Sequence, residues 1–280
     1  MRKSVVIILA ACFSMMCWTT GCTDRKVSVA ADSTATVADS SAEDSLEDLM
    51  DDVPMSKAVD ELFDDFIFNF AGNRKMQLER VKFPLEVVTA GKKTLLDKKQ
   101  WKTDRLFMSQ GYYTLILDNR KQLELSKDTS LCRAVVEKIN LESQTVKKYN
   151  FTRLRGTWML TSIDNSDIVQ NQNSSFLKFY ERFATDFEFQ KKSLNNPIIF
   201  TAPDPDDDFN MLTGDLLPEQ WPDVGPTDLP SGTIYNIIYG QKYTESSQKV
   251  FLLRGIANGQ ELEMTFKKIN GNWKLTRLAE

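Results

Sequence analysis

The sequence predicts an α+β fold built from two similar units in tandem, which follow an export signal and a tether. Three observations support this prediction. The chain begins with a charged and then apolar segment, and a stretch rich in Ser, Ala and Asp follows it. Later, "FTRLRGTWMLTSI" at 151–163 aligns without a gap on "FKKINGNWKLTRL" at 266–278. The 280 residues are enough for two hydrophobic cores of ordinary size.

Residues 1–21 have the organisation of a signal peptide. Arg2 and Lys3 precede an apolar run that continues to Met16, and Thr-Thr-Gly-Cys ends at Cys22. An apolar run of about a dozen residues suits a signal peptide, whereas a membrane-spanning helix needs roughly 18 or more. The order of charge, apolar run and small residues before a cysteine resembles the lipobox of bacterial lipoproteins. That resemblance implies lipidation at Cys22; the alternative is an ordinary signal peptide that ends near a cysteine.

Residues 22–55 are predicted to form an acidic, disordered tether. No Lys or Arg lies between Lys26 and Lys57, and the stretch is dominated by Ser, Ala, Thr and acidic residues. Such a segment buries too little apolar surface to offset the entropy lost on ordering. The tether is either a spacer that holds the folded body away from a membrane or a passive linker.

Residues 56–164 are predicted to form the first α+β unit, starting with a helix capped by Ser56. Its apolar residues fall at one-face spacing, at Val59, Leu62, Phe63, Phe66 and Phe70. Residues 165–280 are predicted to form the second unit, whose first helix repeats that spacing from Phe176 to Phe187, 117 positions later. In both units a short second helix and then alternating runs follow, which predict antiparallel strands. Asn270-Gly271 is typical of a tight hairpin turn.

This organisation resembles a known fold and a known family. A helix with an aromatic face, a short second helix and a last hairpin of the form x-Gly-x-Trp-x-Leu are similar to the nuclear-transport-factor-2-like (cystatin-like) fold. The resemblance implies a cone, in which a curved antiparallel sheet surrounds helices and leaves a cavity at its wide end. With the lipobox and the tether, two such units resemble Bacteroidetes-type lipoproteins catalogued as domain of unknown function 4348. That family implies a fold and a location in the cell envelope, but no reaction.

The composition excludes several classes of function. The chain contains no histidine, which removes Ser-His-Asp and Cys-His catalysis and His-ligated zinc. Its formal net charge is −4 and it has no basic tract, so a nucleic-acid partner is not expected. The predicted membrane contact is therefore through the lipidated N-terminus. If residues 1–21 are removed and Cys22 is lipidated, Cys132 is the remaining thiol; it is predicted to be buried beside Leu131, or to pair between chains.

The comparison of the two halves separates packing from chemistry. Apolar positions recur between them, whereas aligned charged positions differ. A duplicated fold preserves its hydrophobic face, whereas a duplicated catalytic centre would preserve titratable groups. Trp158 and Trp273, which recur, are therefore predicted to be core or cone-lining residues rather than catalytic ones. Asp64 and Asp65 fall between the apolar positions of the first helix and are predicted to face water.

An acidic stretch at 204–215 is the sharpest candidate for a metal site. Its oxygen-bearing residues occupy positions 1, 3, 5, 7 and 12 of a calcium-loop pattern: Asp204, Asp206, Asp208, Asn210 and Asp215. Phe209 stands where such a loop has a turn-forming Gly, so the alternative is a solvated acidic loop. No other cofactor is predicted.

Two tryptophans are candidates for ligand binding. Gln100-Trp101 and Gln220-Trp221 form a repeated pair, and the second lies in a proline-rich loop. An aromatic side chain at the mouth of a cone could stack on a ligand; alternatively, it covers the core as a lid.

These features predict a lipid-anchored protein of the outer membrane, on either its periplasmic side or the cell surface. We expect a non-enzymatic ligand-binding or scaffolding module whose small-molecule or protein ligand the sequence does not identify. One alternative is a small-molecule enzyme that uses a His-free carboxylate and Tyr pocket in one cone. Another is a solute-capture lipoprotein of an uptake system.

Overall fold

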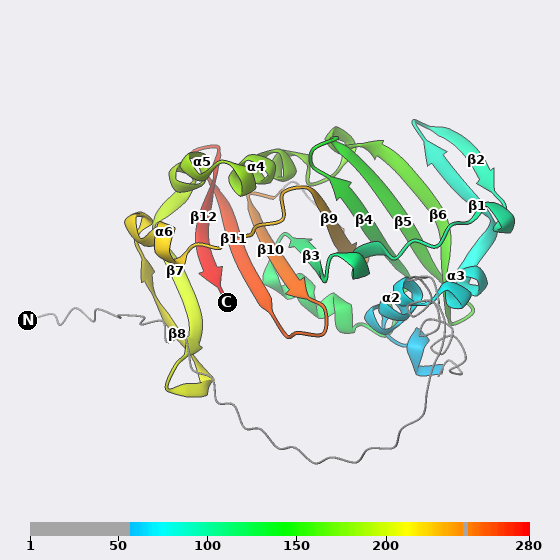
Figure 1. Ribbon diagram of the computed structural model, residues 1–280, viewed down its shortest axis with the longest axis horizontal. Helices are drawn as coiled ribbons and strands as arrows, with labels where there is room; N and C mark the ends of the chain where they lie inside the picture. Colours follow the sequence, from blue (N-terminus) through cyan, green and yellow to red (C-terminus); the bar gives the residue numbers. More distant parts are fainter. Residues whose placement is uncertain (1–56, 243–245) are drawn as a thin grey trace, which may run out of the picture. The chain divides into compact units, whose positions relative to one another are not determined.

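The structure, a computed structural model, describes residues 57–242 and 246–280 (Figure 1). The predicted signal peptide, Cys22, the tether and Ser56 lie outside the described residues.

The helices are α2 (Phe63–Gly72), α3 (Arg74–Arg80), α4 (Ser174–Thr185), α5 (Phe187–Lys192) and α6 (Trp221–Val224). Short 3₁₀ segments cover Lys57–Asp60, Lys98–Gln100, Leu106–Ser109, Arg120–Lys127, Ile168–Gln170 and Pro218–Gln220. The first-half strands are β1 (Val81–Thr89), β2 (Lys92–Leu96), β3 (Tyr112–Leu117), β4 (Arg133–Asn140), β5 (Thr145–Leu154) and β6 (Thr157–Asp167). The second-half strands are β7 (Leu194–Asp204), β8 (Asp207–Leu216), β9 (Thr233–Ile238), β10 (Gln248–Gly255), β11 (Glu261–Ile269) and β12 (Asn272–Ala279).

Within the described residues, twelve strands form one sheet in the order β2-β1-β6-β5-β4-β9-β3-β10-β11-β12-β7-β8. Each strand of the first half corresponds to the strand numbered six higher in the second half, for example β1 to β7. If every strand is replaced by its counterpart, the same strand order results, read in the opposite direction. The two halves are therefore related by an approximate two-fold axis. At the centre, however, β9 pairs with β4 of the first half, and β3 pairs with β10 of the second. The halves thus exchange one strand each.

The central pair explains how the two cores are arranged. β3 and β9 are parallel, with Thr114 opposite Asn236. A two-fold axis that relates parallel neighbours runs along the strands, so it exchanges the two faces of the sheet. Leu115 accordingly belongs to the core under α2, whereas its neighbour Ile116 belongs to the core under α4. The central strands are buried on both faces, as their nearly continuous apolar sequences require.

The recurring tryptophans lie at equivalent places in the two cores. Trp158 on β6 and Trp273 on β12 are 0% and 7% exposed. Their rings pack edge-on against Phe63 and Phe176, with centroids 5.0 Å and 5.5 Å apart. The structure therefore confirms that the repeated motif marks packing.

The helices align differently from the prediction. Equivalent ring contacts relate Phe63 to Phe176, a separation of 113 positions rather than 117. The aromatic residues are spaced by about one helical turn, so a shift of four residues preserves the pattern and conceals the error. In the corrected alignment two polar positions do recur. The side chains of Gln77 and Gln190 donate to the carbonyl oxygens of Phe70 and Phe183, respectively. Asn73 and Asp186 both cap the second helix of their half, by accepting a hydrogen bond from the backbone N–H of Met76 and Phe189, respectively.

The last hairpin of each half has the predicted turn. Asn270 and Gly271 have φ values of 50° and 80°, and Arg155 and Gly156 have 52° and 85°. These left-handed conformations match the twist of two-residue hairpins. The predicted boundary between residues 164 and 165 falls within β6, close to its end.

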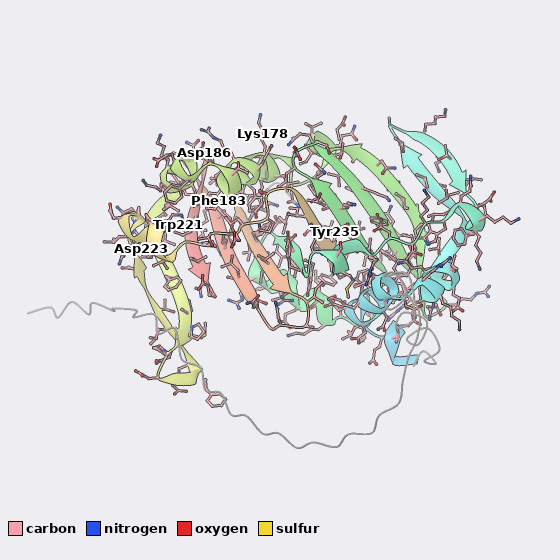
Figure 2. All side chains as sticks on the ribbon, viewed as in Figure 1. Lys178, Phe183, Asp186, Trp221, Asp223 and Tyr235 are labelled. Atoms are coloured by element: carbon pink, nitrogen blue, oxygen red, sulfur yellow. The ribbon has the colours of Figure 1, made fainter. Side chains whose placement is uncertain are left out.

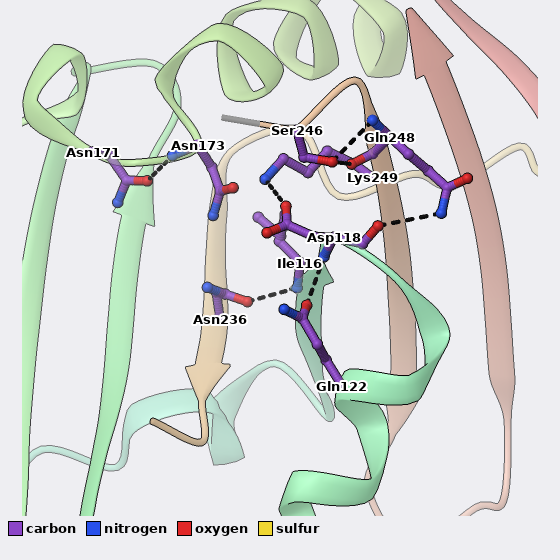
Figure 3. Close-up of polar contacts among 9 residues, drawn as sticks. All are labelled: Ile116, Asp118, Gln122, Asn171, Asn173, Asn236, Ser246, Gln248 and Lys249. Carbon is purple, nitrogen blue, oxygen red and sulfur yellow. Dashed lines mark hydrogen bonds and ion pairs between the residues drawn. The ribbon is translucent and has the colours of Figure 1, made fainter. Parts of the chain in front are cut away.

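A buried polar seam holds the exchanged strand β9 in place, and Figure 3 shows its bond between Asn236 and Ile116. Asn236 accepts a 2.8 Å hydrogen bond from the backbone N–H of Ile116 and donates one of 2.8 Å to Glu137. Asn171 donates to the same carboxylate at 2.7 Å. Glu137 and Asn236 are at most 1% exposed, so each bond replaces water that the groups lost on folding.

Candidate functional site at the mouth of the first cone

The first cone consists of α2 and α3 packed on β1, β6, β5, β4 and β9. Residues in register across these strands form rows on the face of its core. The innermost row is apolar apart from one hydroxyl: Ile237, Val136, Tyr149, Ile163 and Val87. The next row, which we name the polar row, comprises Tyr235, Lys138, Lys147, Asn165 and Thr89. The outer row comprises Thr233, Asn140, Thr145 and Asp167. Because side chains alternate between faces, core gives way to polar surface within two residues.

A groove of about 500 Å³ lies over these rows. Its lining includes four members of the polar row, Thr89, Lys138, Lys147 and Asn165, and three of the outer row, Asn140, Thr145 and Asp167. The groove thus contains the two ammonium groups of the polar row, amide and hydroxyl groups around them, and the Asp167 carboxylate of the outer row. We take it as the candidate functional site.

The two lysines are the unusual feature of the groove. Lys138 and Lys147 are directly opposite each other on β4 and β5, where like charges repel. The Lys147 ammonium lies 3.7 Å from Asp104 and 4.6 Å from the centre of the Tyr149 ring. Burial lowers the pKa of Lys147; the nearby Asp104 opposes this change and Lys138 adds to it. The Lys138 ammonium lies 5.7 Å from the centre of the Tyr235 ring on β9 (Figure 2).

Asp104 is held in place from three sides. Gln77 on α3, fully buried, donates to its backbone carbonyl at 2.9 Å and accepts from its backbone N–H at 3.1 Å. One carboxylate oxygen accepts from the N–H of Leu106 at 3.0 Å, and the other accepts from the hydroxyl of Tyr149. Burial, and then Asp104, raises the pKa of Tyr149. The phenol is therefore a hydrogen-bond donor at neutral pH and not a base.

Among the residues that the structure describes, the second cone has apolar side chains at the positions of the two lysines. On β10 and β11 the equivalents of Lys138 and Lys147 are Leu253 and Leu262, which also face each other. Both leucines pack against the second core. The mouth of the first cone is thus lined by charged residues, whereas leucines cover the core at the equivalent positions of the second cone. The lysine pair was therefore not kept in both copies of the fold.

The predicted tryptophans do not line the groove. Trp221 is 1% exposed, and its indole N–H donates to Gln190 at 2.7 Å (Figure 2). Trp101 packs edge-on against Phe83, with ring centroids 6.2 Å apart, and covers the first core. These positions do not favour ligand stacking, because Trp221 is buried and Trp101 is partly buried against the first core.

The predicted calcium residues lie along the β7–β8 hairpin and not around one point. Asp204 pairs with Asp207 at the tip, whereas Asp215 pairs with Ile199. Five residues of strand separate these two places, roughly 16 Å at the rise of an extended chain. Asp206 and Asn210 are exposed near the tip, and Asp208 belongs to the same hairpin. Among the residues that the structure describes, no three acidic, Cys or His side chains are grouped to hold a metal. The extended hairpin separates ligands that a calcium loop would curl together.

Two further expectations are corrected. Cys132 is exposed rather than buried beside Leu131, and its thiol lies 3.3 Å from the carbonyl oxygen of Ser130. Asp64 is not simply solvated: it is partly buried and accepts a 2.6 Å hydrogen bond from Tyr239.

Sequence reasoning missed the two lysines, although a signal was present. Lys138 is two residues from buried Val136, and Lys147 is four residues from buried Phe151, so each lysine lies on the core-facing side of its strand. A charged residue on the core-facing side of a strand indicates either the end of the core or a functional site.

Comparisons with known proteins agree with this fold. The sequence profile of a family described as "Domain of unknown function (DUF4348)" matches residues 42–280. The crystal structure of an NTF2-like protein from Bacteroides fragilis NCTC 9343 is 40% identical and superposes with a TM-score of 0.74. The match covers 81% of this chain and 98% of that one. A search of curated proteins found no match. In the described part of the chain, every helix is too short or too polar to cross a membrane.

Proposed function

The chain belongs to the family described as a domain of unknown function (DUF4348), and from its NTF2-like fold and its groove we propose a ligand-binding module. The first cone binds a small hydroxylated acid, such as a sugar acid, over the polar row. The opposed pair of Lys138 and Lys147 carries this proposal.

The charges favour an acidic ligand. An anion placed between Lys138 and Lys147 relieves their repulsion and forms charge-assisted hydrogen bonds. Asp104 faces Lys147, and in the described part of the chain no ion pair involves Lys138. Lys138 is therefore the cation that remains available to a ligand.

The remaining groups favour hydroxyls on the same ligand. Amide and hydroxyl side chains surround the lysines, and Asp167 accepts hydrogen bonds at the outer row. A sugar ring with one carboxylate presents both kinds of group. Lipid anchoring through Cys22 in the outer membrane, which we also propose, would expose the groove to envelope carbohydrates.

Binding is favoured over catalysis by the state of Tyr149. Its raised pKa keeps the phenol protonated, and its hydroxyl is already engaged by Asp104. A solute-capture role would use the same groove and differ only in the partner that receives the ligand.

Calorimetric titration with glucuronate tests the proposal, with glucose as the uncharged control. We expect glucuronate to bind at least about tenfold more tightly, since a hydrogen bond to a charged group contributes about 1.5–3 kcal/mol. The double variant Lys138→Leu/Lys147→Leu introduces the residues of the second cone and should abolish this preference. A double variant of exposed lysines, Lys82→Leu/Lys178→Leu, makes the same charge change elsewhere and should retain it. Equal affinity for both sugars, or equal loss in both variants, would overturn the proposal.

A further inference from the structure

The two ends of the sheet differ from the rest of the molecule in having unpaired backbone. Among the strands that the structure describes, β2 pairs only with β1, and β8 pairs only with β7. Each edge therefore presents backbone N–H and C=O groups to which another strand can add. Native proteins usually protect such edges with lysines, proline or short strands.

The two edges are equivalent by duplication but opposite in charge. The β1–β2 hairpin, residues 81–96, contains three lysines and one glutamate. The β7–β8 hairpin, residues 194–216, contains five aspartates and no basic residue. The segment without basic residues extends beyond this hairpin, because no Lys or Arg occurs from residue 193 to residue 241.

The β8 edge also exposes large apolar side chains. Phe209 is 98% exposed, Met211 52% and Leu212 46%. A ten-residue edge strand without a lysine and with exposed apolar residues lacks the usual protection against strand addition. At the opposite edge, Lys92 and Lys93 are exposed on β2, with Leu95 beside them at 66%. Lys93 contacts Glu86 at 2.9 Å, a surface pair that contributes little.

We propose that the β8 edge of one copy pairs with the β2 edge of a second copy, so that the sheet continues from molecule to molecule. Charge selects this arrangement among the pairings of two copies. A β8–β8 contact would bring aspartates against aspartates, and a β2–β2 contact lysines against lysines, whereas β8–β2 joins opposite charges. Such a contact is head-to-tail, and it leaves one free edge of each kind at the ends of the assembly. Association should therefore continue beyond a dimer.

Sedimentation velocity of the full chain tests the proposal, with Cys22→Ser introduced so that no acyl chain contributes. At low ionic strength, where charge interactions extend furthest, the sedimentation coefficient should rise with concentration beyond that of a dimer. Lys92→Glu/Lys93→Glu makes both edges acidic, and Asp206→Lys/Asp207→Lys/Asp215→Lys makes both basic, since three lysines then face two remaining aspartates on the β7–β8 hairpin. Each variant should remain a monomer.

The reversed variants provide the decisive controls. Mixed in equal amounts, they should associate again, because each supplies the edge that the other needs. The variant that combines all five substitutions, with both edges reversed, should associate by itself. Circular dichroism checks that each variant is folded. A monomeric wild type, persistent association of either single-edge variant, or a monomeric mixture and combined variant would each overturn the proposal.

Discussion

At the scale of single residues, Asp64 and its counterpart differ in charge and in burial. Near the start of α2 it accepts a hydrogen bond from Tyr239 of the exchanged region, whereas the equivalent position in α4 is the buried Leu177. Burial, the largest cause, raises the pKa of Asp64, although the hydrogen bond from Tyr239 opposes the change. The ionised carboxylate therefore destabilises the folded state relative to a solvated one.

The replacement Asp64→Asn tests this account through stability. Above its folded pKa the native carboxylate is charged in both states, and its burial penalty is fully present. As pH falls through the raised folded pKa toward the ordinary aspartate pKa of 3.8, the folded state takes up the proton first, so the penalty is relieved. We expect Asp64→Asn to raise the free energy of unfolding at pH 7 and to lose this local gain on acidification. Urea denaturation over pH 3.5–7 measures both; a destabilised variant at pH 7 would contradict the account.

Lys147 gives a prediction for binding. Because burial lowers its pKa below the ordinary lysine value of 10.5, its ammonium loses its proton at a lower pH than an exposed lysine. Affinity for an acidic ligand should therefore decline before pH 10.5 is reached. The variant Lys147→Arg keeps its charge and should hold its affinity to higher pH. Calorimetric titrations across alkaline pH compare the two, and parallel pH profiles would contradict a role for this charge.

At the scale of elements, the two last hairpins allow a matched test. Gly156 and Gly271 have φ values of 85° and 80°, where a side chain is strained. Gly156→Ala and Gly271→Ala should each destabilise the fold by about 1–2 kcal/mol, and by similar amounts. Gly72, which has no positive φ, serves as the control, and Gly72→Ala should not destabilise. Thermal denaturation measures these changes; a large difference between the two hairpins would contradict their equivalence.

The polar seam beside β9 gives a second prediction at this scale. Asn236→Ala removes two buried hydrogen bonds, one from Ile116 and one to Glu137, and should cost about 1–3 kcal/mol for each group left unsatisfied. The control is Asn69→Ala at an exposed position, since surface substitutions usually change the free energy of unfolding by less than about 0.5 kcal/mol. Chemical denaturation that found both variants alike would show that the seam does not hold β9.

The features that could be predicted from the sequence are those whose local patterns recur in both halves. Aromatic stripes and hairpin turns are local patterns, so the helices, the Trp158 and Trp273 core positions and the last turns followed from the residues. The strand exchange did not, because β3 and β9 are both continuous apolar runs and either would fit beside β4 or β10. The groove was missed for a related reason: its lysines come from β4 and β5, and only the pairing register places them opposite each other.

At the scale of the whole described fold, the exchange links the two halves. Each core contains residues from both, since β9 completes the first cone and β3 the second. We therefore expect one cooperative unfolding transition, with equal calorimetric and van't Hoff enthalpies, rather than two. Trp158→Ala in the first core and Trp273→Ala in the second should each cost about 3–5 kcal/mol and shift that same transition. Two separate transitions in scanning calorimetry would contradict the link.

The central claim is that duplication left one closed cone and one cone with a cationic mouth that binds an acid. A crystal structure of the full chain grown with glucuronate tests this most directly. The account predicts electron density for the sugar over the polar row, with its carboxylate between the ammonium groups of Lys138 and Lys147. Density in the second cone beside Leu253 and Leu262, or an empty groove at saturating ligand, would contradict it.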